Sequence, residues 1–244
     1  MVTTLPSIAI IGTGAMGGAI LNGLLGPDVK ISGGIRATNR TESKAAALRV
    51  DGVESFAVET VRNANLLAVA GAKIVLIGVK PFGVIDTLTE IAHALEPDAL
   101  VISVAAGVPT VRMEKVLQNS VLRAMPNTPA LVRLGACAIS AGSTASIDDV
   151  RWASTILEAV GTVDEIDEAA LDAFTGVAGS GPAYVFLVAE ALIDAAVEQG
   201  LDRAMAERVV RQLLLGSATL LDREGDPARL REMVTSPNGT TAAG

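Results

Sequence analysis

The stretch that decides the fold is IAIIGTGAMGGAI, residues 8–20. An apolar run that favours a buried strand is followed at once by Gly12, Gly14 and Gly17, spaced as G-x-G-x-x-G, and then by a helical pattern. These glycines allow a tight turn, close approach of backbone to a pyrophosphate, and close packing of helix on strand. Free N–H groups at the helix start would hold the diphosphate. The stretch therefore predicts a dinucleotide-binding βαβ unit, with a ligand-free tight turn as the weaker alternative.

Short apolar runs alternate with helical patterns from residue 7 to about residue 165. We expect strands at 7–11, 34–39, 73–79, 99–104 and 121–125, with helices at 15–25, 42–50, 61–71, 84–95 and 110–117 between them. Two further strands, 136–140 and 161–166, are expected near the far edge, on either side of a helix capped by Ser146. This alternation predicts an α/β, Rossmann-type, doubly wound parallel sheet with helices on both faces.

The pattern changes after residue 167, where no strand is expected. A long helix ends near Gly200, a second is capped by Asp202, and a third opens at Asp226-Pro227. We therefore expect a dinucleotide-binding domain at residues 1–166 and an all-helical domain at residues 167–244. The central helix is apolar nearly all round and needs cover from several sides. Three helices can hardly supply that cover, so we predict an interlocked homodimer.

Acidic residues interrupt the central helix on one face. Glu190, Asp194 and Glu198 are spaced i, i+4, i+8. A metal site is one interpretation, but a solvated stripe or a surface facing a partner's arginine is favoured.

Composition narrows the class of protein. The net charge is −8, aromatic residues make up 2% of the chain, and basic runs are lacking, so nucleic-acid binding is not expected. The single cysteine, Cys137, and single histidine, His93, exclude an internal disulfide and a Cys/His zinc site, and we expect no metal. No secretory signal is evident, and the apolar run at 66–79 contains Lys73 and is too short to span a bilayer. We therefore expect a cytoplasmic protein that does not bind membranes.

The end of the second expected strand bears on cofactor choice. NAD-preferring sites tend to place an acid there, but this chain has ATNR, residues 37–40. Arg40 could pair with a 2′-phosphate, so NADP is favoured over NAD, and Thr38 and Thr41 could add hydroxyl contacts. The alternative is that Arg40 is an ordinary solvated side chain.

Two further strand ends face the same crevice, at Val79-Lys80-Pro81 and at Ala105-Ala106-Gly107. The small residues of the second would leave room for a flat ring. Lys80 could act as a base, but we favour a main-chain role next to Pro81.

Five motifs then occur in order behind the glycine motif: VKP (79–81), AAG (105–107), MPNTPA (125–130), GSGPAY (179–184) and SPNGTT (236–241). The chain resembles the pyrroline-5-carboxylate reductase family, which makes L-proline by reducing a cyclic imine with NAD(P)H, and the resemblance covers essentially the whole chain. It implies a two-domain homodimer that often assembles further. Alternatives are another NADP-dependent imine or β-hydroxyacid reductase of the same plan, and a non-catalytic NADP-binding module.

The resemblance also implies site residues. Asn39 and Arg40 would lie by the adenosine ribose, Asn65 on the adenine side, and Met125, Pro126 and Asn127 near the nicotinamide. The complete cofactor set is Ile11, Gly12, Thr13, Gly14, Ala15, Met16, Gly17, Asn39, Arg40, Asn65, Gly78, Val79, Lys80, Pro81, Ala105, Ala106, Gly107 and Asn127.

The resemblance places the substrate carboxylate, of 1-pyrroline-5-carboxylate or L-proline, in the last loop. Ser236, Gly239, Thr240 and Thr241 would receive it, and the loop would face the nucleotide domain of a partner chain. Thr241 is our candidate catalytic residue, through a hydrogen bond to the ring nitrogen, while positioning of two flat rings supplies much of the acceleration.

Three features of the chain remain open at this stage. Gly179-Ser180-Gly181-Pro182 is either a helix start or a place where backbone approaches the cofactor or the partner chain. Asn238 stands where the family usually has glycine, and asparagine tolerates left-handed backbone. The family continues for about another helix beyond residue 244, so we expect a truncated C-terminus with a less ordered loop and weaker activity.

Overall fold

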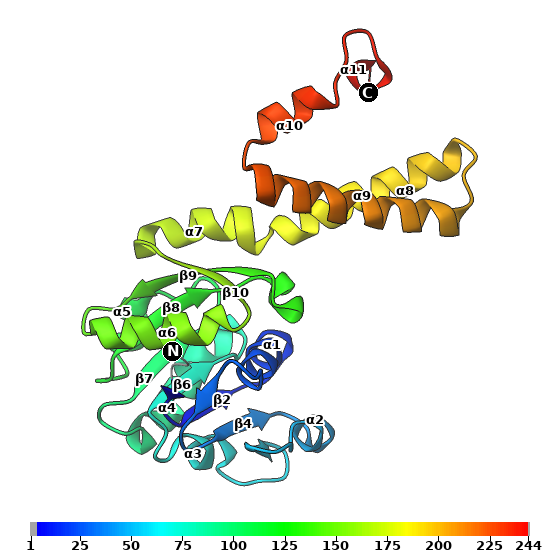
Figure 1. Cartoon of the computed structure of the whole chain (residues 1–244). Helices are drawn as coiled ribbons and strands as arrows, with labels where there is room; N and C mark the ends of the chain where they lie inside the picture. The colour runs from blue at the N-terminus through cyan, green and yellow to red at the C-terminus, as the bar shows by residue number, and fades with distance from the viewer. Residues whose placement is uncertain (1–3, 244) are drawn as a thin grey trace. The chain divides into compact units, whose positions relative to one another are not determined.

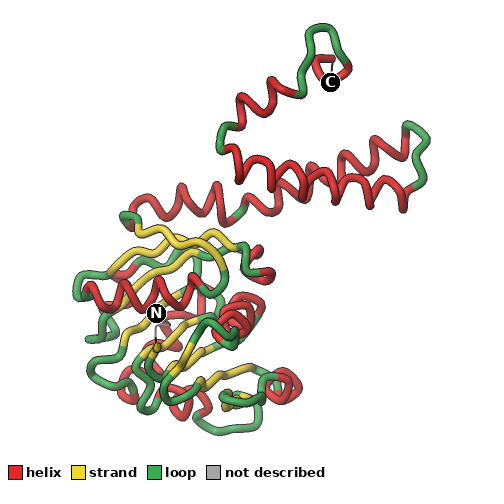
Figure 2. The backbone as a smooth tube through the Cα atoms, viewed as in Figure 1, coloured by secondary structure: helices red, strands yellow, loops and turns green. Residues whose placement is uncertain are grey.

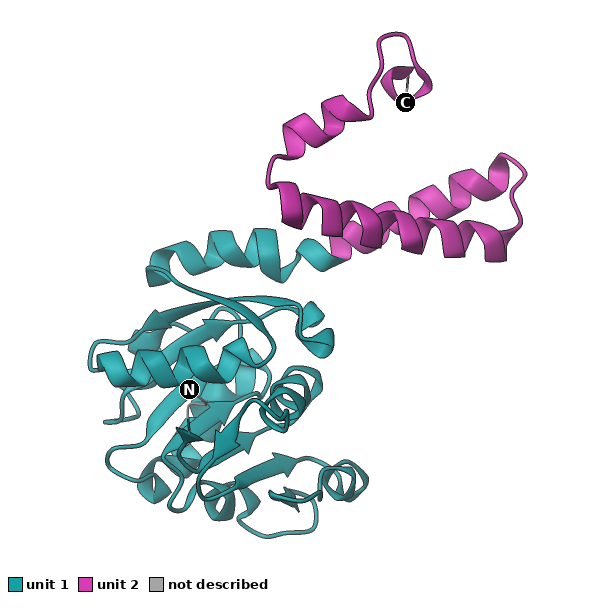
Figure 3. Cartoon of the chain, in the orientation of Figure 1, with its two compact units in different colours: residues 1–182 teal, residues 183–244 magenta. Residues whose placement is uncertain are grey.

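The computed structural model describes residues 4–243 and divides into two compact units, residues 1–182 and 183–244 (Figure 3). The last strand ends at Glu165, and the segment that follows it, up to Pro182, belongs to the first unit. The expected domain boundary after residue 166 marks the change from strands to helices, and it stays a prediction.

The first unit contains ten strands within the described residues. They are β1 (Thr4–Leu5), β2 (Ile8–Ile11), β3 (Lys30–Ile31), β4 (Ile35–Asn39), β5 (Val53–Ala57), β6 (Ile74–Ile77), β7 (Leu100–Ser103), β8 (Val121–Met125), β9 (Gly135–Ala141) and β10 (Gly161–Glu165). The helical segments are α1 (Ala15–Leu24), α2 (Glu42–Ala47), α3 (Ala64–Val69), η1 (Pro81–Gly83), α4 (Val84–Ile91), η2 (Ala92–Ala94), α5 (Thr110–Glu114), η3 (Thr128–Val132), α6 (Ile147–Glu158), η4 (Glu168–Ala170), α7 (Leu171–Phe174) and η5 (Thr175–Gly179, a π-helical turn).

Strands of the first unit lie side by side as a large sheet (Figures 1 and 2). Eight of the strands form this sheet, in the order β10-β9-β8-β7-β6-β2-β4-β5. This confirms the predicted α/β class and doubly wound sheet. All neighbouring strands are parallel except β8 and β9, which are antiparallel. The expectation of a purely parallel sheet is therefore wrong at this one pairing. The physical reason is the connection through η3, which is too short to serve as the crossover that a parallel pair needs.

Helices cover both faces of this sheet, and the alternation of side chains along β2 shows how. Ile8 and Ile10 belong to a core with α1 and α6, whereas Ala9 and Ile11 belong to a second core with α3, α4 and α5. Successive side chains of a strand point to opposite faces, so a strand covered on both faces has a continuous apolar sequence. This is why the run at residues 8–11 is fully buried.

The sequence patterns missed β5 and the small β1–β3 sheet. Glu54 and Ser55 interrupt the apolar run of β5, and this strand lies at the sheet edge, where it pairs only with β4 in the eight-stranded order. An edge strand buries fewer side chains, so its apolar signal is weak. The strands β1 and β3 are two residues long, too short for any periodicity to show.

The second unit is helical throughout its described residues. Its helices are α8 (Gly181–Glu198, which begins at the end of the first unit), α9 (Arg203–Glu224), α10 (Pro227–Met233) and α11 (Thr240–Ala243). The expected helix signals are confirmed. Gly200 has a left-handed φ of 95°, Asp202 accepts a hydrogen bond from the Met205 amide at 3.2 Å, and Asp226 accepts from the amides of Ala228 and Arg229.

The apolar surface of α8 is open in the single chain. Val185, Phe186 and Leu187 are 49%, 65% and 64% exposed. The continuous helical stretch Glu168–Glu198 contains an 18-residue window with a mean hydropathy of 1.5, and by length and composition alone it could cross a membrane. Large apolar surfaces of this kind are usually covered by another molecule.

The third glycine of the opening motif gives a test of the α1–β2 packing. A Cβ atom at Gly17 would lie 2.9 Å from the Gly12 carbonyl oxygen, whereas one at Gly18 would meet nothing within 4 Å. We expect Gly17→Ala to lower the free energy of unfolding by about 1–3 kcal/mol, because α1 must move away from rigid backbone. Gly18→Ala is the matched control and should be neutral or stabilising by up to about 1 kcal/mol.

Denaturant unfolding of the three proteins, followed by circular dichroism, measures this difference. Equal stabilities for Gly17→Ala and the unsubstituted chain would contradict the close-packing role of Gly17.

Candidate functional site

The carboxyl ends of β2 and β6 lie side by side at the centre of the sheet, where the strand order changes direction. Ile11 is in register with Ile77, and the Gly78 amide donates to the Ile11 carbonyl oxygen at 2.8 Å. A Cβ at Gly78 would lie 2.6 Å from the Gly12 carbonyl oxygen, and Gly12 has a left-handed φ of 85°. Neither position has room for a side chain, so bare backbone forms the crevice in which doubly wound sheets bind ligands.

Gly14 and the start of α1 complete this crevice. Gly14 is exposed, and a Cβ there would meet nothing within 4 Å, so open space lies in front of it. No side chain caps the first turn of α1. Uncapped N–H groups and the helix dipole together favour an anionic ligand such as a diphosphate.

Side chains from β4 hold the glycine loop. The Thr13 amide and hydroxyl both donate to the Thr38 carbonyl oxygen at 2.9 Å, and the Gly12 amide donates to the Thr38 hydroxyl at 3.1 Å. The Asn39 amide group donates to the Thr13 hydroxyl at 2.5 Å and to the Thr13 carbonyl oxygen at 3.1 Å. Asn39 is 7% exposed, and its buried amide nitrogen holds the glycine loop through Thr13. Its expected place beside a ribose stays a prediction.

Arg40 follows Asn39 and is exposed. Its guanidinium makes no ion pair within residues 4–243. Nearby on the chain, the Thr41 hydroxyl is buried without a hydrogen-bond partner. The Asn65 amide nitrogen donates to Glu90 at 2.9 Å, while its buried oxygen also lacks a partner. Unpartnered polar atoms are uncommon in folded proteins, and their presence here fits a place for a polar ligand.

The other two strand ends are at Val79-Lys80-Pro81 and at Ala105-Ala106-Gly107, and their contacts with a cofactor stay a prediction. Lys80 is exposed and precedes the turn η1, which Pro81 opens. After β7, Ala105 is buried, while Gly107 is exposed with a left-handed φ of 73° and has open space around it. These residues leave room beside the carboxyl edge of β7.

The end of β8 is tied to the segment that follows the sheet. The Asn127 side-chain oxygen accepts from the Ala136 amide at 3.0 Å, and its nitrogen donates to the Ala178 carbonyl oxygen at 2.9 Å. The π-helical turn η5 brings Gly179 against Met125, where a Cβ would lie 2.8 Å from the Met125 methyl carbon. Asn127 therefore joins β8, β9 and η5, and direct contact of its side chain with a cofactor stays a prediction.

The helix-start interpretation of Gly179–Pro182 is confirmed, because Pro182 lies in the first turn of α8. Gly179 approaches the end of β8, and approach of this backbone to a cofactor or a partner chain stays a prediction. Another cluster in this region was not predicted, in which Arg123 of β8 pairs with Glu168 and Asp172. Its only local signal is an arginine in an otherwise apolar strand.

The expected substrate residues lie together in one loop of the second unit. The Gly239 amide donates to the Ser236 carbonyl oxygen at 3.0 Å, which closes the turn, and Thr240 and Thr241 begin α11. Asn238 has a φ of 61°, so it adopts the left-handed backbone that a glycine would adopt there. The threonines and Ser236 are exposed.

Cys137 and His93 do not supply a nucleophile or base at the crevice. Burial in β9 raises the pKa of the Cys137 thiol to about 12, so it stays protonated at neutral pH. His93 lies in η2, which follows α4. Among the described residues, no group of three His, Cys, Asp or Glu side chains could hold a metal ion.

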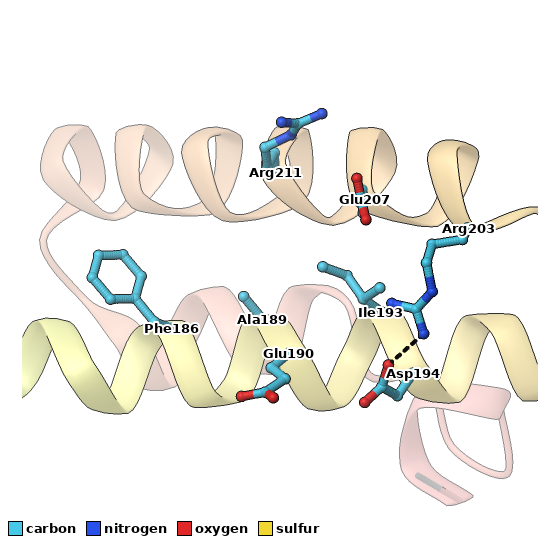
Figure 4. Close-up of a pocket in the computed structure, with 8 residues that line it drawn as sticks. All are labelled: Phe186, Ala189, Glu190, Ile193, Asp194, Arg203, Glu207 and Arg211. Carbon is cyan, nitrogen blue, oxygen red and sulfur yellow. Dashed lines mark hydrogen bonds and ion pairs between the residues drawn. The ribbon is translucent and has the colours of Figure 1, made fainter.

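Two residues of the acidic stripe, Glu190 and Asp194, line a hollow of about 350 Å³ between α8 and α9 (Figure 4). Asp194 pairs with Arg203 of the same chain at 2.9 Å, and Glu190, Glu207 and Arg211 line the same hollow. The structure therefore gives Asp194 a partner within the chain.

A doubly wound sheet with a bare glycine crevice, followed by a helical unit, defines a dinucleotide-dependent oxidoreductase of two units. A family model for NADP oxidoreductases, coenzyme F420-dependent, matches residues 7–107, and one for pyrroline-5-carboxylate reductase dimerisation matches residues 168–244. Pyrroline-5-carboxylate reductase of Pseudomonas aeruginosa is 41% identical over 98% of this chain and 86% of its own length, and that of Escherichia coli is 37% identical over 96% and 86%.

Solved structures agree with these matches. A pyrroline-5-carboxylate reductase from Coxiella burnetii superposes with a TM-score of 0.85 at 36% identity, covering 97% of this chain and 87% of the other. That of Plasmodium falciparum, with NADP bound, superposes with a TM-score of 0.83 at 26% identity, over 97% and 87%. A Streptomyces aurantiacus imine reductase, with a TM-score of 0.60 at 20% identity over 92% and 77%, shares the fold alone. The chain belongs to the pyrroline-5-carboxylate reductase family.

Proposed function

We propose that this chain reduces 1-pyrroline-5-carboxylate to L-proline with hydride from NADPH, the last step of proline biosynthesis. The observation that carries the proposal is 41% identity to a pyrroline-5-carboxylate reductase over 98% of the chain. Support also comes from the crevice at Gly12 and Gly78, where bare backbone leaves room for a dinucleotide.

NADPH is the proposed cofactor, in preference to NADH. Arg40 is exposed directly after β4, where an acid would repel a 2′-phosphate and an arginine attracts it. The NADP-oxidoreductase family match to residues 7–107 includes this position. Thr41, which follows Arg40, and Asn65 carry buried polar atoms without a hydrogen-bond partner. These atoms could contact the adenosine end of the cofactor.

The residues of the crevice would orient the cofactor. The uncapped start of α1 would bind its diphosphate, and the small residues 105–107 would leave space for its flat ring. When bound, the reduced nicotinamide supplies the hydride. Because hydride transfer to a protonated imine needs little from side chains, positioning accounts for most of the catalysis.

The loop from Ser236 to Thr241 is proposed to bind the substrate. Hydroxyls and amides of Ser236, Gly239, Thr240 and Thr241 would hold the carboxylate without placing a strong base beside it. The Thr241 hydroxyl would accept a hydrogen bond from the protonated ring nitrogen and so hold the electrophilic carbon in place.

A homodimer is proposed for the assembly, with the substrate loop facing the nucleotide unit of a partner chain. The open apolar surface of α8 and the match of residues 168–244 to a dimerisation model support this proposal. The partner chain, rather than lipid, would cover the stretch Glu168–Glu198. We further propose a cytoplasmic protein that binds neither membranes nor nucleic acid.

Turnover with defined substrates tests the proposed reaction. NADPH oxidation, followed by absorbance, should depend on added 1-pyrroline-5-carboxylate and should yield L-proline on chromatography. Addition of 2-oxo acids should give no oxidation. Oxidation with a 2-oxo acid or another imine, but not with pyrroline-5-carboxylate, would point to a different reductase. Tight NADPH binding without any turnover would point to a non-catalytic module.

Arg40→Ala tests the cofactor preference. Removing the guanidinium should raise KM for NADPH about 10-fold and change KM for NADH little, because only NADPH has a 2′-phosphate to pair with it. Arg151→Ala is the control, since Arg151 is an exposed arginine on α6 that pairs with Asp148. Equal changes for the two cofactors would contradict the assignment.

Thr241→Ala tests the proposed catalytic hydroxyl. Loss of this hydrogen bond should lower kcat/KM for pyrroline-5-carboxylate about 10- to 100-fold. Thr241→Ser, which keeps the hydroxyl, should retain most of the activity. Thr219→Ala is the control, because the Thr219 hydroxyl donates within α9 to the Leu215 carbonyl oxygen at 2.7 Å. Unchanged kinetics for Thr241→Ala would exclude the role.

A further inference from the structure

A buried arginine in β8, Arg123, forms ion pairs with two carboxylates from the segment that follows the sheet. Arg123 is 4% exposed, and its guanidinium lies 3.5 Å from the Glu168 carboxylate and 3.3 Å from the Asp172 carboxylate. The Asp172 side chain is 88% exposed and the Glu168 side chain 28% exposed. Solvent screens the Arg123–Asp172 pair much more than the Arg123–Glu168 pair, so Glu168 is the more important partner of Arg123.

The same Glu168 carboxylate binds the start of α5. One of its oxygens accepts from the Thr110 amide at 2.8 Å, and the other accepts from the Thr110 hydroxyl at 2.7 Å. The residue before Thr110 is Pro109, which cannot cap the helix with its side chain. Glu168 therefore supplies the cap for α5 from a distant part of the chain. We refer to Thr110, Arg123, Glu168 and Asp172 as the Glu168 network.

Thr110 follows the turn at residues 105–107 closely, and hydrogen bonds to Glu168 fix both its amide and its hydroxyl. The Ala105 amide makes only a long contact of 3.4 Å to the Ser103 hydroxyl, and Gly107 has open space around it. Val108 is buried and Pro109 has a fixed φ of −66°, so the link from Gly107 to Thr110 is short and stiff. Fixing Thr110 therefore restricts the turn.

Glu168 itself stands on a well-anchored segment. Leu171, three residues further on, is fully buried in the first unit. At the far end of the segment, Ala178 accepts a hydrogen bond from Asn127, and Gly179 lies against Met125. A segment anchored at Leu171 and again at residues 178–179 can hold the Glu168 carboxylate in place, and the carboxylate can then fix the groups that it binds.

The turn at 105–107 lies on the side of the crevice away from the adenosine end. Arg40 follows β4, on one side of β2, whereas β6, β7 and β8 lie on the other side. A dinucleotide whose diphosphate meets α1 and whose adenosine lies near β4 must extend its nicotinamide toward β7. Movement of the turn would thus disturb the reacting ring and leave the adenosine end in place.

We propose that Glu168 is a positioning residue for hydride transfer, which holds the turn at residues 105–107 through Thr110, while Arg123 holds the Glu168 carboxylate. The inference rests on the proposed function, because it names a residue that acts on the same reaction. Glu168 does not touch the reacting atoms and acts only through the turn.

Glu168→Gln is the direct test, since it removes the charge and one hydrogen-bond acceptor with little change in shape. We expect kcat to fall about 10-fold, while the NADPH dissociation constant changes less than about 3-fold. The kinetic isotope effect on kcat, measured with NADPH deuterated at the transferred position, should increase because hydride transfer becomes slower. Asp98→Asn, which removes the ion pair with Lys73 at 2.6 Å, is the control and should leave these values unchanged.

Thr110→Val and Thr110→Ser provide a second test that leaves Glu168 intact. Valine should lower kcat and raise the isotope effect, and serine should restore both. If Glu168→Gln does not fold, this pair decides the question. A Glu168→Gln protein with lower thermal stability but unchanged kcat and isotope effect would overturn the proposal, since Glu168 would then be only structural.

Hydrogen–deuterium exchange separates this inference from the proposed function. Amides of residues 105–110 should exchange faster in Glu168→Gln than in the unsubstituted protein and the Asp98→Asn control. If the unsubstituted protein shows no pyrroline-5-carboxylate reduction, the proposed function fails, and this exchange result alone decides whether Glu168 holds the turn. Equal exchange at these amides in all three proteins would overturn the inference whatever the activity.

Discussion

The contact between the backbones of Gly12 and Gly78 is the constraint on which the rest of the crevice depends. It forms where β2 and β6 end side by side, and neither residue has space for a Cβ. Because no side chain fills this place, the uncapped start of α1 and the open side of Gly14 stay accessible. Apolar cores cover both faces of the sheet, and the sheet holds these loops in place. Their backbone N–H groups can therefore act as hydrogen-bond donors of fixed position.

Polar side chains around the crevice mostly hold backbone rather than point into it. Asn39 holds the glycine loop through Thr13, Asn127 joins β8 and β9 to the turn at Thr175–Gly179, and Glu168 caps α5. Each is partly or fully withdrawn from solvent, and each satisfies backbone groups that a loop would otherwise leave unpaired. This arrangement suits a reaction that needs two flat rings held in place and little acid–base chemistry.

The helical unit leaves part of its apolar surface uncovered in the single chain. Its long helix α8 is apolar on several sides, and α9 covers only part of it, so large side chains such as Phe186 and Leu187 stay exposed in one chain. A large exposed apolar surface usually marks a site where another molecule binds. The match of residues 168–244 to a dimerisation model agrees with this physical expectation.

The sequence by itself determined the features that depend on neighbouring residues. Hydrophobic periodicity located most strands and helices, turn chemistry placed the caps at Ser146, Asp202 and Asp226, and the glycine spacing located the crevice. Only the tertiary structure decided the edge position of β5, the antiparallel β9, and the partners of Asn127 and Glu168. Ala178 lies 51 residues from Asn127 and Thr110 lies 58 residues from Glu168 along the chain, and no local pattern encodes these two pairings. Hydrogen bonds of this kind form only when the sheet brings distant segments together, so they depend on the packed fold and not on neighbouring residues.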